Sequence, residues 1–272
     1  MHFKSILQFW LFAERVIENT RYRYSPRDEE FLDAVRETGS QRIITLPLKT
    51  VLYRAQLDHR TERNTLKNVY RPSAPSRMKP EPKSAKEGRV NPKGIPCLYL
   101  ADNPQTAMSE VRPWLGAYVS IGHFETTKDL KLMDCTVPKQ YSRGYGLRKQ
   151  RQPPRELEEW VWSEISNAFS EPVTDSDKTA NYAPTQILSE VFRQIGCDGI
   201  KYRSLLGEGG HSFALFNLDD AKMISCGLCT VEKIHHPDFS EEEKIYALTE
   251  DGKEVERILP EADLTGMVNQ TK

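Results

Sequence analysis

The hydrophobic pattern divides the chain into helical stretches and short apolar runs. Apolar residues recur every three or four positions in two segments before residue 40, and the same spacing returns at 155–169 and 184–195. This spacing predicts four amphipathic helices. Apolar runs bounded by turn residues predict strands at 43–46, 51–57, 97–101, 117–125, 130–136, 199–205 and 211–216. Near the carboxyl end, two further runs flank Asp251-Gly252 and are typical of a hairpin.

This order of elements indicates the fold class. Strands outnumber helices in the second half of the chain, and most neighbouring strands are close in sequence. Such an arrangement favours an α+β fold with a mixed, mainly antiparallel sheet and flanking helices over a doubly wound sheet. We expect residues 1–42 to form an N-terminal helical extension, 43–230 the main domain, and 231–272 a hairpin extension packed on that domain.

Residues 59–88 interrupt the pattern. Together with Arg89, this stretch holds nine Lys or Arg against three Glu, contains four Pro and shows no apolar periodicity. Its composition leaves open a linker, a functional or disordered loop, and a mobile cationic flap that closes over a phosphate-bearing ligand. A nucleic-acid-binding role is disfavoured, because Tyr70 is almost alone as an aromatic platform and the prolines are many.

A turn and a strand follow this stretch. Residues 91–94 read Asn-Pro-Lys-Gly, so Arg89 is expected at the edge of a loop. The apolar run 97–101 lies between Pro96 and Asp102 and predicts a buried strand that carries Tyr99.

The next residues predict a helix. Asp102 or Asn103 can cap its first amides, and Pro104 suits the first helical position. Glu110 lies beside an apolar face, so it is a candidate for chemistry or an ordinary flanking carboxylate. The residues spaced to form that face are Ala107, Val111 and Trp114.

Composition and charge narrow the classes of function. With 272 residues, 38% hydrophobic and 28% charged, the chain can bury a sizeable core. A formal net charge of −1 and a pI near 6.6 provide no overall field for nucleic acid or an anionic membrane. The apolar run at 6–13 is too short to span a bilayer. Five cysteines without a secretory segment indicate reduced thiols and a cytoplasmic location.

Cys226 and Cys229 form a CxxC pair, followed by His235 and His236. Adjacent residues of a strand point to opposite faces, so the two histidines are poorly placed to share one zinc ion with the cysteines. We therefore expect no metal site.

Three segments in order carry a resemblance to a known family. They read GRVNPKGIPCLYLADNPQTAMSEV at 88–111, YAPTQILSEVFRQIGCDGIKYRS at 182–204 and GGHSFALF at 209–216. Over roughly residues 45–230 the chain resembles the RES domain family, named for the Arg, Glu and Ser of its motif. The positions that match its functional residues are Arg54, Arg89, Tyr99, Glu110 and Ser204, with Ser212 as the alternative motif serine.

The resemblance implies a fold similar to ADP-ribosyltransferase toxins and an activity on NAD. Members of the family break the bond between nicotinamide and ribose and pass ADP-ribose to inorganic phosphate, to water or, in some cases, to a protein. Many are toxins that a helix-turn-helix antitoxin neutralises by covering the site. NAD is then a substrate rather than a cofactor, and a homo-oligomer remains open.

The chemistry of these residues agrees with that activity. Loss of nicotinamide develops positive charge on the ribose, which a carboxylate such as Glu110 can stabilise. Arg54 and Arg89 would bind the pyrophosphate, Tyr99 would stack on the nicotinamide ring, and Ser204 would fix an amide or hydroxyl group. Arg112 is expected to be structural only. The alternatives are a protein ADP-ribosyltransferase and a non-catalytic module that binds NAD or ADP-ribose.

Overall fold

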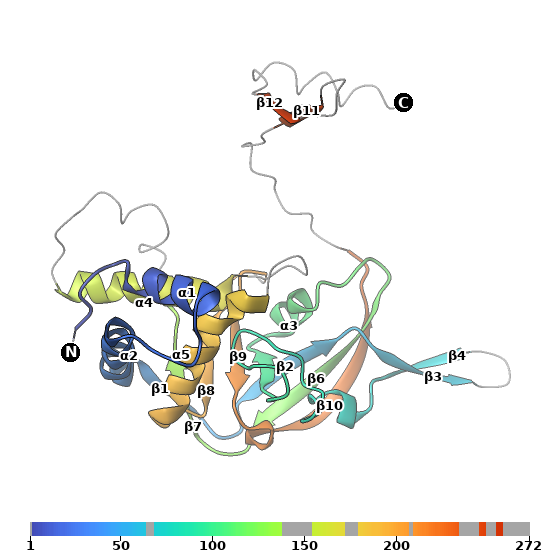
Figure 1. Cartoon of the computed structure of the whole chain (residues 1–272). Helices are drawn as coiled ribbons and strands as arrows, with labels where there is room; N and C mark the ends of the chain where they lie inside the picture. Colours follow the sequence, from blue (N-terminus) through green and yellow to red (C-terminus); the bar gives the residue numbers. More distant parts are fainter. Residues whose placement is uncertain are drawn as a thin grey trace. The chain divides into compact units, whose positions relative to one another are not determined.

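The computed structural model describes residues 2–63, 68–137, 154–171, 179–206, 209–233, 245–248 and 254–257. Two compact units make up the chain, residues 1–232 and residues 233–272. Figure 1 shows the elements of both units.

Five α-helices are described, of which α2 and α3 begin at side-chain caps. They are α1 (Gln8–Glu18), α2 (Pro26–Gly39), α3 (Pro104–Glu110), α4 (Pro154–Ser170) and α5 (Ala183–Gln194), with short 3-10 turns at Ser40–Arg42, Pro75–Arg77, Thr179–Tyr182 and Leu218–Asp220. At the start of α2 the Asp28 carboxylate accepts a 2.6 Å hydrogen bond from the Ser25 backbone amide, which satisfies a group that would otherwise lack a partner. The helices expected at 155–169 and 184–195 are confirmed.

The described strands of the first unit are, in chain order, β1 (Ile43–Leu46), β2 (Val51–Gln56), β3 (His59–Arg63), β4 (Asn68–Pro72), β5 (Leu98–Ala101), β6 (Tyr118–Thr126), β7 (Leu130–Asp134), β8 (Gly199–Arg203), β9 (His211–Leu215) and β10 (Ala221–Thr230). Eight of them form one sheet in the order β1-β7-β8-β9-β5-β2-β6-β10. Within this sheet β7 and β8 run parallel, and the other described neighbours are antiparallel. The predicted α+β class with a mainly antiparallel sheet is therefore confirmed.

The sheet opens between β2 and β5. These strands pair at one position, Tyr53 with Ala101, whereas β2 pairs with β6 along its whole length and β5 pairs with β9 along its whole length. The side chain of Arg54 spans the opening and donates a 2.9 Å hydrogen bond from Nη1 to the Tyr99 carbonyl oxygen. The Arg54 side chain thus bonds β2 to β5 where the backbone hydrogen bonds between these strands give out and the two halves of the sheet diverge.

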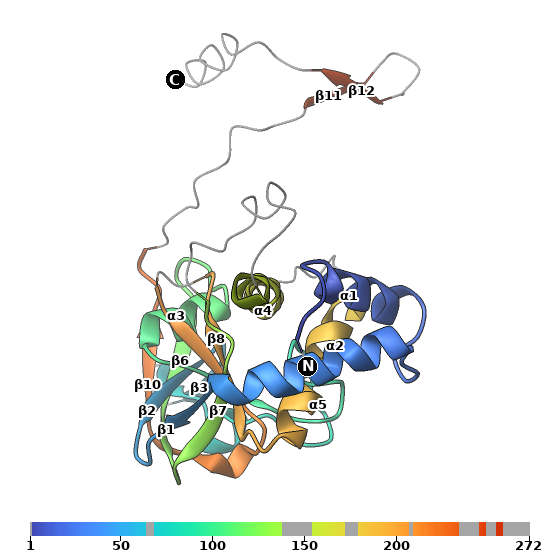
Figure 2. The same ribbon diagram turned by 90° about the vertical axis from the view of Figure 1, so that its left-hand side faces the viewer.

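Helices α1, α2, α4 and α5 cover the β7–β8 half of the sheet (Figures 1 and 2). Their apolar faces form one buried cluster with Met133, Ile200 and Tyr202 of the sheet. Trp162 of α4 is fully buried and donates a 3.0 Å hydrogen bond to Thr38 of α2. Residues 1–42 therefore share a core with the rest of the first unit.

Residues 59–88 are more regular than the linker or structureless loop considered from the sequence. Strands β3 and β4 pair as an antiparallel hairpin, which projects beyond the sheet in Figure 1. The Tyr70 ring of β4 lies 4.7 Å from the Tyr118 ring of β6 between centroids, and Met78, fully buried, belongs to a second core cluster. Aromatic and apolar contacts thus anchor the segment on the sheet.

In the second unit, β11 (Ile245–Leu248) and β12 (Glu254–Arg257) pair as an antiparallel hairpin. This confirms the hairpin expected near the carboxyl end. Its packing on the rest of the chain stays a prediction.

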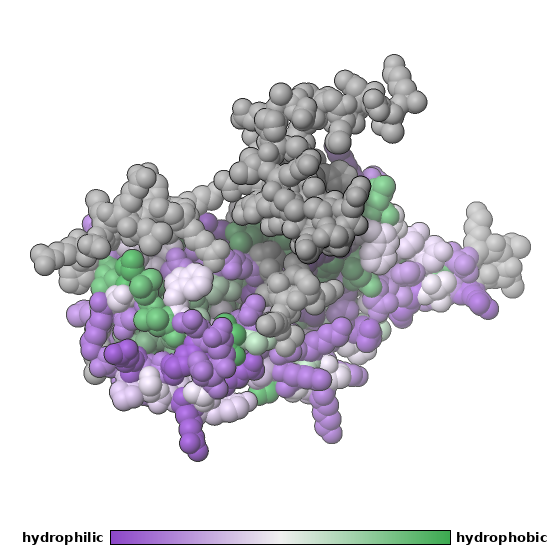
Figure 3. Space-filling view, turned by 45° about the horizontal axis from the view of Figure 1, so that its top comes forward, coloured by the Kyte–Doolittle hydropathy of each residue, from purple (hydrophilic) through white to green (hydrophobic). Residues whose placement is uncertain are grey.

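The face that Figure 3 presents is mainly hydrophilic, with hydrophobic residues in scattered groups. Trp114, expected to face a core, is 64% exposed, because α3 ends at Glu110 and the chain turns away at Arg112, whose φ is 46°. Among the described residues, the helices include none with the length and apolar character needed to cross a membrane.

Candidate active site

Helix α3 positions Glu110. The Asn103 side chain caps its start by accepting a 2.8 Å hydrogen bond from the Thr106 amide, and Pro104 occupies the first turn. Ala107 is buried and holds the helix against the sheet. Glu110 is the last residue of α3 and is half-buried. The backbone of Glu110 is therefore fixed by the helix.

Two buried serines hold one oxygen of that carboxylate. Ser204, just after β8, donates a 2.7 Å hydrogen bond to Glu110 Oε1, and Ser212 on β9 donates a 3.2 Å bond to the same oxygen. Each serine is 3% exposed. The sequence left open which serine belongs to the site, and the structure brings both to Glu110.

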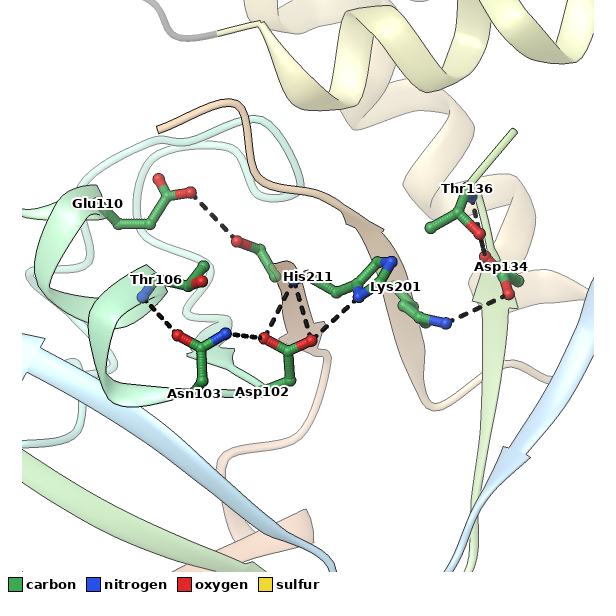
Figure 4. Close-up of polar contacts among 9 residues, drawn as sticks. Asp102, Asn103, Thr106, Glu110, Asp134, Thr136, Lys201 and His211 are labelled. Carbon is green, nitrogen blue, oxygen red and sulfur yellow. Dashed lines mark hydrogen bonds and ion pairs between the residues drawn. The ribbon is translucent and has the colours of Figure 1, made fainter. Parts of the chain in front are cut away.

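A tight approach between β9 and α3 makes this arrangement possible. A side chain at Gly210, just before β9, would collide with Thr106 in the first turn of α3. Next to this contact, Asp102 and His211 face each other, with His211 Nδ1 3.0 Å from Asp102 Oδ2 (Figure 4). The same carboxylate accepts from the His211 backbone amide at 3.1 Å. These contacts fix the strand and helix that carry Ser212 and Glu110.

Two arginines lie near the carboxylate with spare hydrogen-bonding capacity. The Nε atoms of Arg54 and Arg89 are buried and have no hydrogen-bond partner among the described residues. Burial lowers the pKa of Arg54 from its usual value because the guanidinium loses hydration, while Tyr99 opposes the change. Buried, under-bonded guanidinium groups are suited to binding an anion.

Tyr99 fastens the turn that carries Arg89. Its hydroxyl donates a 2.7 Å hydrogen bond to Asn91 Oδ1 and accepts a 3.2 Å bond from the Val90 amide. Burial raises the pKa of Tyr99 well above its usual value, and Arg89 is among the groups that oppose this. The structure therefore gives the hydroxyl a positioning role that the sequence did not suggest.

These side chains line one cavity of about 430 Å³. Of the predicted site residues, Arg54, Arg89, Tyr99, Glu110 and Ser212 line it directly, and Ser204 reaches it through its bond to Glu110. The volume falls within the range of about 300–1,000 Å³ that is usual for ligand sites. Arg112, expected to be structural only, also lines the cavity. Tyr53, Tyr182 and Leu206 complete much of its wall.

Tyr202 is a site residue that sequence reasoning missed. It is 2% exposed, lines the cavity, and its ring centroid lies 6.0 Å from the guanidinium carbon of Arg89. Burial is the main cause that raises the pKa of Tyr202 to about 12; Arg89 and a hydrogen bond with Ser212 oppose this change, and Glu110 acts in the same direction as burial. The indication available in the sequence was that Tyr202 lies two residues before Ser204 in the predicted strand 199–205.

No group of three or more potential metal ligands occurs among the described residues. Cys226 and Cys229 lie on β10, whereas His235 and His236 fall outside the described residues. The cavity lining carries arginines, one carboxylate, tyrosines and a serine, which is a set for binding an anionic organic molecule.

The sequence matches the RES domain family over residues 51–234. No curated protein matches the chain. Among solved structures, one similar chain comes from the "Crystal structure of the M.tuberculosis MbcT-MbcA toxin-antitoxin complex", with 17% sequence identity and a TM-score of 0.42 over 72% of this chain and 92% of that one. Because the family match spans more than half of the chain and includes Arg54, Arg89, Glu110 and Ser204, the chain belongs to the RES domain family.

Proposed function

We propose that this protein cleaves NAD between nicotinamide and ribose and passes ADP-ribose to inorganic phosphate or water. The observation that carries the proposal is the Glu110 carboxylate, one oxygen of which is held by two buried serines, at the wall of a cavity that is also lined by Arg54, Arg89 and Arg112. A single oriented negative charge beside paired cationic groups suits a substrate with a cationic leaving group and a pyrophosphate.

In this reaction the bond between the ribose C1 and the nicotinamide nitrogen breaks, and its electron pair leaves with nicotinamide. The ribose carbon becomes electron-deficient, and the Glu110 carboxylate stabilises the developing charge. A phosphate oxygen, or the oxygen of a water that loses a proton, forms the new bond to C1. Removal of one such oriented group typically costs a factor of about 10²–10³ in rate.

Arg89 would hold the pyrophosphate through its free Nε donor, since guanidinium groups form strong charge-assisted bonds to phosphate oxygens, and Arg54 would add positive charge at the same wall. The Tyr99 ring borders the cavity and would pack against the nicotinamide ring, while its hydroxyl stays on the turn. Ser204 and Ser212 would act on the carboxylate rather than on the substrate.

Membership of the RES domain family supports a toxin role, with a helix-turn-helix antitoxin that covers the cavity as its partner. The cytoplasmic location and the possible homo-oligomer expected from the sequence are part of the same proposal.

Incubation of the purified protein with NAD, with and without phosphate, tests the activity when free nicotinamide and the sugar product are followed by chromatography. We expect nicotinamide release from the wild type and a loss of at least about 10²-fold in the Glu110→Gln variant. Glu190→Gln, an exposed glutamate of α5, is the matched control and should keep wild-type activity.

The products separate the alternatives. ADP-ribose phosphate identifies phosphorolysis, free ADP-ribose identifies hydrolysis, and label retained on a protein from NAD labelled in its ADP-ribose portion identifies protein ADP-ribosylation. Tight binding of NAD by the wild type without release of nicotinamide would reject the enzyme and favour a binding module.

A further inference from the structure

A second cavity, of about 420 Å³, adjoins the first. The two share Arg54 and Tyr99 in their walls. These residues lie on β2 and β5, the strands that pair at a single position. The opening in the sheet therefore separates two cavities with one guanidinium group common to both.

The chain segment 86–89 runs from one cavity to the other. Lys86 and Glu87 line the second cavity, whereas Gly88 and Arg89 line the first. The turn is held in place by Gln186 of α5, whose side-chain amide donates a 2.9 Å hydrogen bond to the Gly88 carbonyl oxygen. Lys86 and Arg89 thus lie on the same fixed stretch of backbone, one at each cavity.

Positive charge predominates in the second cavity. Its wall includes Arg54, Arg77, Lys79 and Lys86. Against these four cations stand two carboxylates, from Glu81 and Glu87.

These four cations differ in whether their side chains already bind a protein group. Arg77 lies 3.5 Å from Asp58 in an exposed pair, which holds it weakly, and Lys79 donates a 2.6 Å bond to the Leu218 carbonyl oxygen. In the part of the chain that the structure describes, the Lys86 ammonium has no partner. The Nε of Arg54 is likewise buried without one.

From this arrangement we infer that the second cavity is a binding site for a phosphate group, held between the buried guanidinium of Arg54 and the side chains of Lys86 and Arg77. A phosphate oxygen would satisfy the buried donor of Arg54, and the exposed Lys86 and Arg77 would supply the remaining charge-assisted bonds. Arg77, Lys79 and Lys86 of the basic stretch 59–88 then line a defined cavity.

The phosphate group can come from inorganic phosphate or from a nucleotide whose other end occupies the first cavity. The binding of phosphate to this cavity does not depend on NAD cleavage. The role of that phosphate, as the acceptor of ADP-ribose or as a part of NAD, rests on the proposed function.

Titration of the full-length protein with inorganic phosphate, followed by calorimetry or phosphorus NMR, tests the site. We expect Lys86→Ala to weaken binding about tenfold, the effect of one lost charge-assisted bond. Lys83→Ala is the matched control: Lys83 is an exposed lysine three residues away that does not line the cavity, so binding should match the wild type. Equal affinity of the two variants, or no phosphate binding by the wild type, would overturn the inference.

A second titration, with ADP-ribose present at saturation, separates the two sources. Phosphate that still binds identifies a site for the free ion. Phosphate that is displaced, with Lys86→Ala also weakening ADP-ribose, identifies a site for a nucleotide phosphate.

The Glu110→Gln variant keeps failure of this site distinct from failure of the proposed function. It should bind phosphate as the wild type does, because Glu110 lines the first cavity and not the second. If phosphate binding depends on Lys86 but no nicotinamide is released, the proposed function fails and the second site stands. If nicotinamide is released but phosphate binding is unchanged in Lys86→Ala, the second site alone fails.

Discussion

Removal of the Ser204 hydroxyl should weaken the proposed NAD cleavage without unfolding the protein. The Ser204 bond to Glu110 Oε1 is 2.7 Å long, within the short range of charge-assisted O–H···O bonds, whereas the 3.2 Å bond from Ser212 is longer than the usual range of such bonds. The first bond therefore carries most of the orientation of the carboxylate.

The expected magnitudes follow from these lengths. A hydrogen bond to a charged group contributes about 1.5–3 kcal/mol, so Ser204→Ala should lower kcat/KM for NAD about 10- to 100-fold. Ser212→Ala should cost about 0.5–1.5 kcal/mol, which is less than about 15-fold. Because both serines act through Glu110, neither substitution should reduce activity much further in a Glu110→Gln background.

Steady-state release of nicotinamide provides the assay, and urea unfolding of each variant shows whether the fold survives. Undiminished kcat/KM in Ser204→Ala would refute the positioning role, as would a loss in the Glu110→Gln background equal to that in the wild type. A larger effect of Ser212→Ala than of Ser204→Ala would reverse the assignment of the dominant serine.

Three other predictions concern the groups around the site. Tyr99→Phe removes the hydroxyl that bonds Asn91, so the turn should loosen, KM for NAD should rise more than kcat falls, and stability should drop by about 1 kcal/mol. Burial raises the pKa of Tyr202 to about 12, against about 10 for an unfolded tyrosine. The native state therefore keeps a proton that the unfolded state releases, and stability should decline by up to about 2–3 kcal/mol as pH rises from about 10 to 12, with a smaller decline in Tyr202→Phe. Gly210→Ala should destabilise the protein by about 1–3 kcal/mol and lower activity, because the new methyl group collides with Thr106.

Each of these has a direct check. Steady-state kinetics that show a fall in kcat with unchanged KM would contradict the role given to Tyr99. Urea unfolding at several pH values that shows the same alkaline decline with and without the Tyr202 hydroxyl would contradict the pH prediction. Wild-type stability of Gly210→Ala would mean that α3 moves aside freely.

Much of the fold could be predicted because its apolar periodicity is local. The cap at Asn103 and the apolar strand that contains Tyr99 are defined by residues within one or two turns of chain. The hairpin of β3 and β4 could not be predicted in this way. Its strands read HRTER and NVYRP, mostly exposed and without an apolar alternation, and Tyr70 contacts Tyr118, a residue distant in sequence.

The site residues that belong to a sequence motif could be predicted, whereas those whose role depends on tertiary packing could not. Arg89, Glu110 and Ser204 match a family pattern, so they could be proposed together from the sequence. Tyr202 could not be distinguished from a core aromatic residue, since its role arises from its neighbours Arg89 and Ser212. The second cavity depends on the opening between two strands, and no local pattern encodes such an opening.

Glu110 and the two serines that orient its carboxylate are synthesised at different times. The two serines lie 94 and 102 residues further along the chain, on a strand pair that must join the sheet before either hydroxyl reaches α3. A nascent chain that ends before β8 therefore contains the carboxylate without either serine. For a protein proposed to destroy NAD, this order of synthesis delays activity until nearly the whole first unit has been made.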